Sequence, residues 1–478
     1  MLKARLMVVL GFVLLAGGLI GFASVDDGLR VESARVGAVP VRLVRSEPGS
    51  GGVARPVVVV VHGYAGSGRL MRPFADTLAR RGYLVALPDL AGHGANPERL
   101  TQEALDRDLA AVIRFARGLA DADPDRVALV GHSMGAAAVV RAGAADQTIA
   151  ATVAISIGDD ASAALRPGPR HLLGMYGAFE PAGIGATERA MGAERVVAVP
   201  LVEHIGVLFA DRTHHETAQW LDRALHHRPE RSVIAAKDRL LPGILSLAGG
   251  LLIVTGALLV LRRRTGSGRV SPDRVPGRRE RLGLRLGAVV VAPIAGEVVG
   301  VGLAYLLPNT VTGYLTGYFA GCGVVLGAAA QLVHRPARPA RPSLPSVGGA
   351  ALLAVVALAA VVLPVHFGLT DVAPHGPDWW VIALLGLAVA GLLIGAHALL
   401  GPPWSYAAVL ALCLPMPAAS LAGLAPGFLA IISPLVMVLL ALHFAVGAAA
   451  GRPRWRTVAA GALTVAWPVA VVLPVLGR

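Results

Sequence analysis

The stretch RVALVGHSMGAAAVVRAGAA, residues 126–145, decides the fold of this chain. Val127 to Val130 form an apolar run typical of a buried strand, and the small aliphatic residues from Met134 onward favour a helix. Between them the pentapeptide Gly131-His-Ser-Met-Gly135 places Ser133 on a tight turn. A serine between a strand and a helix has an exposed hydroxyl, and the glycines allow the backbone to crowd, so this pattern predicts a nucleophile.

Strands and helices are predicted to alternate on both sides of this turn. Five successive valines, Val57 to Val61, are typical of a strand that is buried on both faces. The last helix is predicted to open at the capping-box spacing Thr213-His-His-Glu216. These repeated units predict one doubly wound α/β domain with a mostly parallel sheet. Besides the valine run, the pattern predicts a polar hairpin at 31–44 and strands at 83–87, 127–130, 152–157, 171–176 and 196–202.

The composition of the whole chain excludes both a disordered chain and an ordinary soluble protein. The 478 residues have a mean hydropathy of +0.64, with 55% hydrophobic and 15% charged residues. Residues 26–238 hold 24 Lys+Arg and 25 Asp+Glu, so the net charge of +13 resides in the remaining, apolar part of the chain. The excess arginines stand in loops beside apolar runs, where membrane orientation explains them. We therefore exclude nucleic acid as a partner.

The apolar runs predict a membrane protein in three parts. Residues 1–25 are predicted to be a membrane anchor or a signal peptide, 26–238 an exported α/β domain, and 239–478 an all-α polytopic domain of about eight helices. The prolines of 401–426 favour a re-entrant or broken helix, which leaves open whether the chain has eight or nine spans. The arginine-rich loops 262–285, 334–341 and 451–456 then all fall on the cytoplasmic side, as the positive-inside rule requires.

Three motifs together resemble the α/β-hydrolase family, over about residues 31 to 228. They are the GHSMG pentapeptide, His62-Gly-Tyr-Ala-Gly-Ser-Gly68, and Pro88-Asp-Leu-Ala-Gly-His-Gly94. The resemblance implies that Ser133 is the nucleophile and that the backbone N–H groups of Met134 and of Tyr64 or Ala65 form the oxyanion hole. It also implies a structural role for His62 and His93, because the family's general base follows the nucleophile in the sequence.

The resemblance also indicates an acid and a base. Glu180, in the turn after the strand at 171–176, is the first candidate for the acid, and Asp159 or Asp160 after the preceding strand is the alternative. His204 follows the last strand and is the candidate base. His214 and His215 compete by proximity, but in the first turn of a helix they are expected to be exposed. No cofactor is predicted, and no metal, because adjacent histidines point to different faces of a helix.

Other residues carry weaker signals. Only about a dozen residues separate the strands ending at Ile157 and beginning at His171, so no large cap is predicted over the pocket. Glu297 lies within an apolar run, where a carboxylate is expensive and has a functional role by default; a protonated carboxyl bonded to a neighbouring helix is the alternative. Both cysteines, Cys322 and Cys413, fall in apolar runs and are expected to pack as small residues.

The sequence thus predicts a serine hydrolase that is tethered to the cell membrane, with its hydrolase domain on the extracytoplasmic side. It would cleave a carboxylic ester or a related acyl compound, from a small-molecule or lipid substrate, through an acyl-enzyme intermediate. The alternative is a membrane transporter or binding protein whose exported domain is a vestigial recognition module. Membrane lipid is the other expected partner.

Overall fold

The computed structural model describes most of the chain and divides it into two compact units. We name them the sheet unit, which comprises Gly18–Ile244, Val365–Ala373 and Pro474–Arg478, and the helical unit, which comprises Met1–Gly17, Leu245–Pro364 and Pro374–Leu473. Each unit is described by itself. The described residues are 2–47, 54–158, 167–181, 183–229, 231–264, 278–307, 309–333, 344–450 and 455–474.

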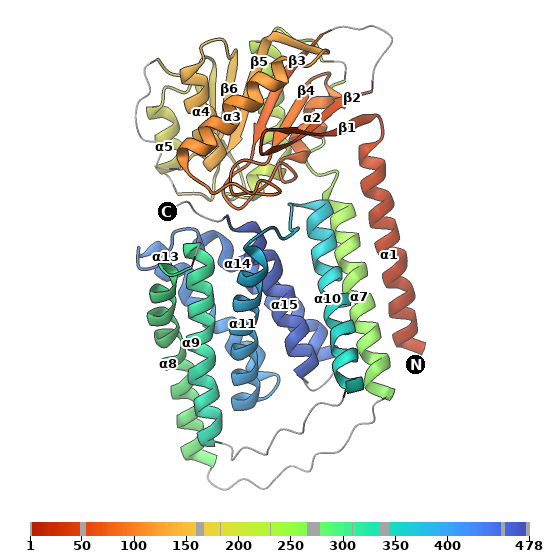
Figure 1. The fold of residues 1–478 in the computed structure, drawn as a ribbon, viewed down its shortest axis with the longest axis vertical. Helices are drawn as coiled ribbons and strands as arrows, with labels where there is room; N and C mark the ends of the chain where they lie inside the picture. Colours follow the sequence, from red (N-terminus) through yellow and green to blue (C-terminus); the bar gives the residue numbers. More distant parts are fainter. Residues whose placement is uncertain are drawn as a thin grey trace. The chain divides into compact units, whose positions relative to one another are not determined.

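The sheet unit is built on eight strands in the order β1-β2-β4-β3-β5-β6-β7-β8, of which Figure 1 labels β1 to β6. The hairpin β1–β2 and the pair β2–β4 are antiparallel, and every other neighbouring pair is parallel. The predicted fold class, a doubly wound and mostly parallel sheet, is confirmed. The strands are β1 (Leu29–Val36), β2 (Val39–Ser46), β3 (Arg55–Val61), β4 (Leu84–Pro88), β5 (Ala122–His132), β6 (Ala151–Ile155), β7 (Leu172–Gly177) and β8 (Arg195–Val199).

The valine run of β3 is buried because helices cover both faces of the sheet. Val58 and Val60 pack in one core with helices α2 (Arg72–Arg80) and α6 (Asp211–Ala224). The alternate valines of the run pack in a second core with α3 (Gln102–Arg117) and α4 (Met134–Ala145). A shorter helix, α5 (Gly183–Ala190), packs against β7 and β8. A strand with two apolar faces therefore fixes the centre of the sheet.

The start of α6 differs from the prediction. The helix begins at Asp211, two residues before the expected cap at Thr213, and Ala210 provides no side-chain cap. With this earlier start, His214 lies against α2, where it is fully buried and stacks on Phe74 at 4.0 Å between ring centroids. Its expected exposure is therefore wrong, whereas His215 is exposed as expected.

Buried charges connect the two ends of the segment that carries the sheet. Asp76 on α2 is fully buried, and its carboxylate accepts hydrogen bonds from Arg72 Nε at 2.7 Å and from Arg239 Nε at 2.6 Å. Both arginines also contact the carboxylate of Asp26, the last residue of α1 (Leu2–Asp26). Arg239 directly precedes α7 (Leu240–Arg264). The entry to the sheet unit and the exit from it thus meet on one face of α2.

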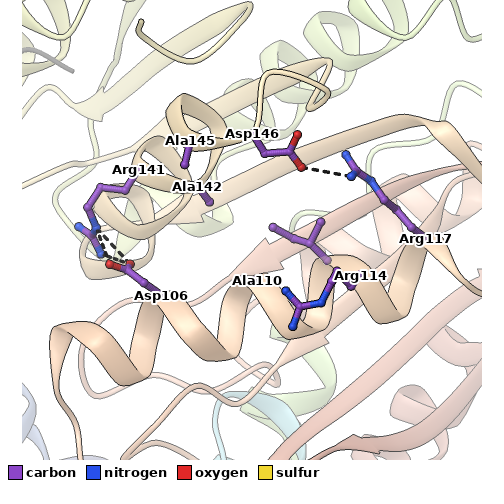
Figure 2. A pocket seen from close by; sticks show the side chains of 9 residues that line it. Asp106, Ala110, Arg114, Arg117, Arg141, Ala142, Ala145 and Asp146 are labelled. Carbon is purple, nitrogen blue, oxygen red and sulfur yellow. Dashed lines mark hydrogen bonds and ion pairs between the residues drawn. The ribbon is translucent and has the colours of Figure 1, made fainter. Parts of the chain in front are cut away.

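A surface groove of about 520 Å³ lies between α3 and α4 (Figure 2). Two ion pairs border it, Arg141 with Asp106 at 2.8 Å and Arg117 with Asp146 at 3.1 Å. All four side chains are partly exposed, so water screens both pairs.

The helical unit contains long apolar helices. Six helices among the described residues are long and apolar enough to cross a membrane, which fits a membrane protein. The segment 404–421 is broken at Cys413 and Leu414 into α12 (Trp404–Leu412) and α13 (Pro415–Leu421). The arginine-rich loops of the predicted topology lie largely outside the described residues, and the number of spans stays a prediction. The six are Leu2–Asp26, Leu240–Val260, Leu282–Ala304, Thr310–Val333, Asp378–Leu400 and Trp404–Leu421. The remaining helices of this region are α10 (Leu344–Gly368), α14 (Leu429–Ala450) and α15 (Trp455–Val472).

Glycines bring α8 (Arg278–Ala304) and α9 (Thr310–Val333) into backbone contact. A Cβ atom on Gly313, Gly317 or Gly321 would lie 2.4 to 2.7 Å from a carbonyl oxygen of α8. This spacing of small residues every four positions is typical of helix pairs in membranes.

Replacing the buried carboxylate of Asp76 should destabilise the sheet unit. Asp76→Asn leaves two buried guanidinium groups with weaker partners, and we expect a loss of about 3 kcal/mol in the free energy of unfolding. Asp106→Asn, at the partly exposed pair with Arg141, is the matched control and should cost less than about 1 kcal/mol. Urea unfolding of the full chain in detergent, followed by pulse proteolysis of the sheet unit, measures both. Equal stability of the two variants would contradict this role for Asp76.

Candidate active site

Ser133 stands on a strained turn between β5 and α4. Its backbone has φ 53° and ψ −117°, in the region that L-residues rarely adopt. A Cβ atom on Gly131 would lie 2.3 Å from the carbonyl oxygen of Gly135, and a Cβ on Gly135 would lie 2.4 Å from that of His62. Glycine is therefore required at both positions, because neighbouring backbone atoms leave no space for a side chain.

The structure brings three of the predicted residues into one line of hydrogen bonds. Ser133 Oγ lies 3.0 Å from His204 Nε2, and His204 Nδ1 lies 2.5 Å from Glu180 Oε1. Ser133 follows β5, Glu180 stands in the turn after β7, and His204 follows β8. Because these strands are parallel, their carboxyl ends meet at one edge of the sheet. The alternative acids, Asp159 and Asp160, lie outside the described residues.

Glu180 is held as a carboxylate by three hydrogen bonds. Burial disfavours its charge, but donors at both oxygens outweigh burial and hold the pKa of Glu180 below its ordinary value. Besides His204, the hydroxyl of Ser156 donates to Oε2 at 2.7 Å and the N–H of Gly177 at 2.6 Å. Sequence reasoning missed Ser156. Its only signal was its position directly after β6, at the same edge of the sheet.

A second buried carboxyl, Glu188 on α5, was also missed. It is 1% exposed, and neither of its oxygens has a hydrogen-bond partner among the described residues. Burial, followed by the nearby charge of Glu180, raises the pKa of Glu188 to about 8. Glu188 is therefore mostly neutral at pH 7, which leaves Glu180 as the charged member of this pair.

His132 supports the backbone that carries His204. Its Nε2 lies 2.9 Å from the carbonyl oxygen of His204, and the two rings are 4.8 Å apart. Burial and the neighbouring His204 lower the pKa of His132 to about 3, so its neutral ring donates this bond. His132 stands at a position of the G-x-S-x-G pattern that accepts any residue, so the pattern did not predict this role.

His62 and His93 join the loops that follow β3 and β4. His62 Nδ1 donates to the carbonyl of Gly63 at 2.9 Å, and its Nε2 accepts the N–H of Leu90 at 3.1 Å. His93 Nδ1 lies 2.9 Å from the carbonyl of Ala91. Burial lowers the pKa of both rings, to about 3 for His93. Both histidines are thus engaged with the backbone of their own loops.

The predicted oxyanion donors lie on two segments beside Ser133. Met134 is the first residue of α4, so its N–H belongs to the free amino end of the helix. Tyr64 and Ala65 belong to the loop after β3, and a Cβ on Gly63 in this loop would lie 3.1 Å from the Cβ of Ser133.

Two exposed apolar side chains flank the acid and the base. Phe179, next to Glu180, is 68% exposed, and Leu201, three residues before His204, is 81% exposed. The N–H of Phe179 donates to the carbonyl of Val202 at 3.1 Å, so the two turns are joined. Among the described residues, no group of three or more His, Cys, Asp or Glu is placed to hold a metal ion.

Glu297 in the helical unit bonds to a neighbouring helix. The hydroxyl of Tyr314 on α9 donates to its Oε2 at 2.6 Å. Both sequence hypotheses for Glu297 stay predictions. In the same unit, His397 Nδ1 lies 2.6 Å from the carbonyl oxygen of Leu393. The thiols of the two free and buried cysteines, Cys322 and Cys413, donate to backbone carbonyls.

Comparison with known proteins finds a family match over part of the sheet unit, including Ser133. Residues 52–179 match the family of serine aminopeptidases, S33. The chain is 37% identical over 93 residues to an uncharacterized protein of Mycobacterium tuberculosis H37Rv, which covers 20% of this chain and 33% of that protein. It is 35% identical over 78 residues to a thermostable monoacylglycerol lipase of Bacillus sp. H-257, and this match covers 16% of this chain and 31% of the lipase. The chain thus spans about a third of the length of these relatives.

Solved structures of hydrolases resemble part of this chain at lower identity. A Pyrococcus furiosus esterase is 17% identical with a TM-score of 0.34, covering 42% of this chain and 95% of the esterase. A dienelactone hydrolase described from Klebsiella pneumoniae is 18% identical with a TM-score of 0.33, covering 42% and 99%. The strand order and the family match over residues 52–179 show that this chain carries a domain of the α/β-hydrolase fold, which is fused to a helical region with several apolar helices.

Proposed function

We propose that this protein is a membrane-tethered serine hydrolase that cleaves a carboxylic ester, or a related acyl compound, through an acyl-enzyme intermediate. The observation that carries the proposal is the line of hydrogen bonds from Ser133 through His204 to Glu180. Nucleophile, base and orienting acid are the three groups that this chemistry needs, and they come together from separate strands.

The geometry supports a defined path for the proton. With its proton on Nδ1, His204 donates to Glu180 and leaves Nε2 free to accept the proton of Ser133. The serine oxygen then attacks the acyl carbonyl, and the imidazolium that forms is stabilised by the carboxylate. His204 returns the proton to the leaving alcohol, and the same groups activate water to hydrolyse the acyl-enzyme.

The developing oxyanion needs donors fixed beside Ser133. We assign this role to the N–H of Met134 and to that of Tyr64 or Ala65. Such donors act where charge appears only in the transition state, and losing one costs on the order of 3 kcal/mol.

A lipid ester is the substrate class that we favour. Phe179 and Leu201 expose apolar side chains beside the acid and the base, where an acyl chain or a lipid surface could cover them. The monoacylglycerol lipase among the relatives acts, by its name, on such a compound. From the arginine-rich segments and the positive-inside rule, we assign the hydrolase domain to the extracytoplasmic side.

Removing the nucleophile should abolish both covalent labelling and turnover. For Ser133→Ala in the full chain, we expect no labelling by a fluorophosphonate and a loss of at least about a thousandfold in p-nitrophenyl ester hydrolysis. Ser33→Ala, at an exposed serine of β1, is the control and should behave as wild type. A folded wild-type chain that neither labels nor hydrolyses esters would favour the binding or transport alternative.

The two buried carboxyls should differ in their importance for turnover. Glu180→Gln removes the charge that orients and stabilises His204, and we expect kcat to fall by about a thousandfold. Glu188→Gln replaces a carboxyl that is mostly neutral at pH 7 with a group of the same shape, so kcat should stay within about twofold. Steady-state kinetics at pH 7 tests both. Similar losses in the two variants would argue against Glu180 as the acid.

Glu188 should also make stability depend on pH. The unfolded carboxyl loses its proton near the ordinary value of 4.5, whereas the folded one keeps it until about pH 8. The wild-type chain should therefore lose stability as the pH rises between these values. Glu188→Gln lacks this loss, so its thermal midpoint should match wild type at pH 4.5 and exceed it at pH 8. A constant difference between the two midpoints would contradict the assignment.

A further inference from the structure

The loop after β3, residues 63–68, carries the proposed oxyanion donors and has no regular secondary structure to fix it. Ala65 has φ 61°, which a residue with a side chain adopts only when its surroundings hold it. The N–H of Gly66 bonds to the carbonyl of Gly63 at 3.0 Å within the loop. From outside, the N–H of Gly68 bonds to Asp89 Oδ1 at 2.8 Å. This bond fixes the end of the loop that is nearer to β4.

A second anchor comes from a distant part of the sequence. The segment 365–373 comprises the end of α10 and the first part of the connection to α11 (Asp378–Leu400), and it belongs to the sheet unit. Within it, Thr370 Oγ1 lies 3.0 Å from Ser67 Oγ, and the N–H of Asp371 donates to the same oxygen at 3.0 Å. Ser67 is 1% exposed and Thr370 is buried beside it. The only hydroxyl of the loop after β3, apart from the phenol of Tyr64, is therefore held by this segment.

Arg69, just after the loop, binds the same segment. Its NH2 group lies 3.3 Å from His366 Nε2, and its guanidinium carbon lies 6.0 Å from the centre of the Phe367 ring. His366 Nδ1 in turn lies 3.4 Å from Asp371 Oδ1. Burial disfavours the charge of Asp371, but the bonds from His366 and from the N–H of Ala373 outweigh it and lower the pKa of Asp371 to about 2. The carboxylate of Asp371, the imidazole of His366 and the guanidinium of Arg69 thus form a continuous row of polar contacts.

We propose that the segment 365–373 positions the oxyanion loop through Ser67, so that Thr370 and Asp371 are positioning residues for the reaction. The inference rests on the proposed function, because it assigns the loop a transition-state role. It makes the catalytic geometry depend on a segment that is continuous with two apolar helices. Oxyanion donors must be fixed within a fraction of an ångström, and a displacement of 1 Å can reduce the rate a hundredfold.

The contact between Ser67 and the segment 365–373 is polar, which favours a role in orienting the loop over a role in stabilising the fold. Buried hydroxyls and charges contribute little net stability compared with apolar groups of the same size, but they impose direction. The two bonds converge on the single hydroxyl of Ser67, two residues after the strained Ala65. Freed from them, the loop would keep the bond at Gly68 but gain access to other conformations at Gly63 and Gly66.

The test uses the full chain in detergent with a p-nitrophenyl ester. Thr370→Val removes one bond to Ser67, and Ser67→Ala removes both. We expect each to lower kcat by about tenfold with KM within about twofold of wild type. The double variant should be no slower than Ser67→Ala, because both changes act on one contact. Thr370→Ser should recover activity, and Thr255→Val, whose hydroxyl bonds to the carbonyl of Leu251 in its own helix, is the matched control.

A second readout does not depend on activity. Amide hydrogen exchange of residues 63–69 should become faster in Thr370→Val and stay unchanged in Thr255→Val. Unchanged exchange, an unchanged kcat, a change in KM alone, or losses that multiply in the double variant would each overturn the inference. If wild type neither hydrolyses esters nor labels with a fluorophosphonate, the proposed function fails. Faster exchange in Thr370→Val would then still establish the anchor, and its catalytic purpose would fall with the function.

Discussion

Ser133 connects β5 to α4 and has a positive φ. The rest of the site depends on the close approach of the backbone segments on either side of this residue to each other and to β3. Gly131 faces the carbonyl of Gly135, and Gly135 faces that of His62, so β3, β5 and α4 meet with no room for a side chain. This contact sets the distance between the nucleophile and the loop after β3. A larger residue at either glycine would separate the serine from the groups that must surround it.

Around this turn the protein keeps most of its titratable groups neutral. His62, His93 and His132 are buried with lowered pKa values, and the pKa of Glu188 is raised. Glu180 is the exception, because three donors compensate for its burial. Of the two neighbouring carboxyls Glu180 and Glu188, only the one that bonds His204 is thereby charged at pH 7. A charge in a poorly solvated setting acts more strongly on its neighbour than one in water.

Local patterns were enough to predict the sheet and the turn at Ser133, whereas the first choices for acid and base came from the family resemblance. The valine run could pack only as a doubly covered strand, and His204 and Glu180 stood after strands whose carboxyl ends must converge. Other features depend on contacts across long stretches of chain. Ser67 and Thr370, which contact each other, are 303 positions apart in the sequence. The orientation of His214 depends on the residue at which α6 begins. The residues around Glu188 in the sequence do not indicate that its side chain is buried.

The buried cluster at Asp76 also bears on how this chain could be assembled from parts. Asp26 and Arg239 both reach it, and a Cβ atom on Gly21 would lie 3.0 Å from the ring of Pro242, so the backbone enters and leaves the hydrolase domain at neighbouring points. A domain whose ends meet can be inserted into a connection without separating the elements on either side. The hydrolase domain thus has the topology of an insertion between two successive apolar helices, which a short turn could join in its place.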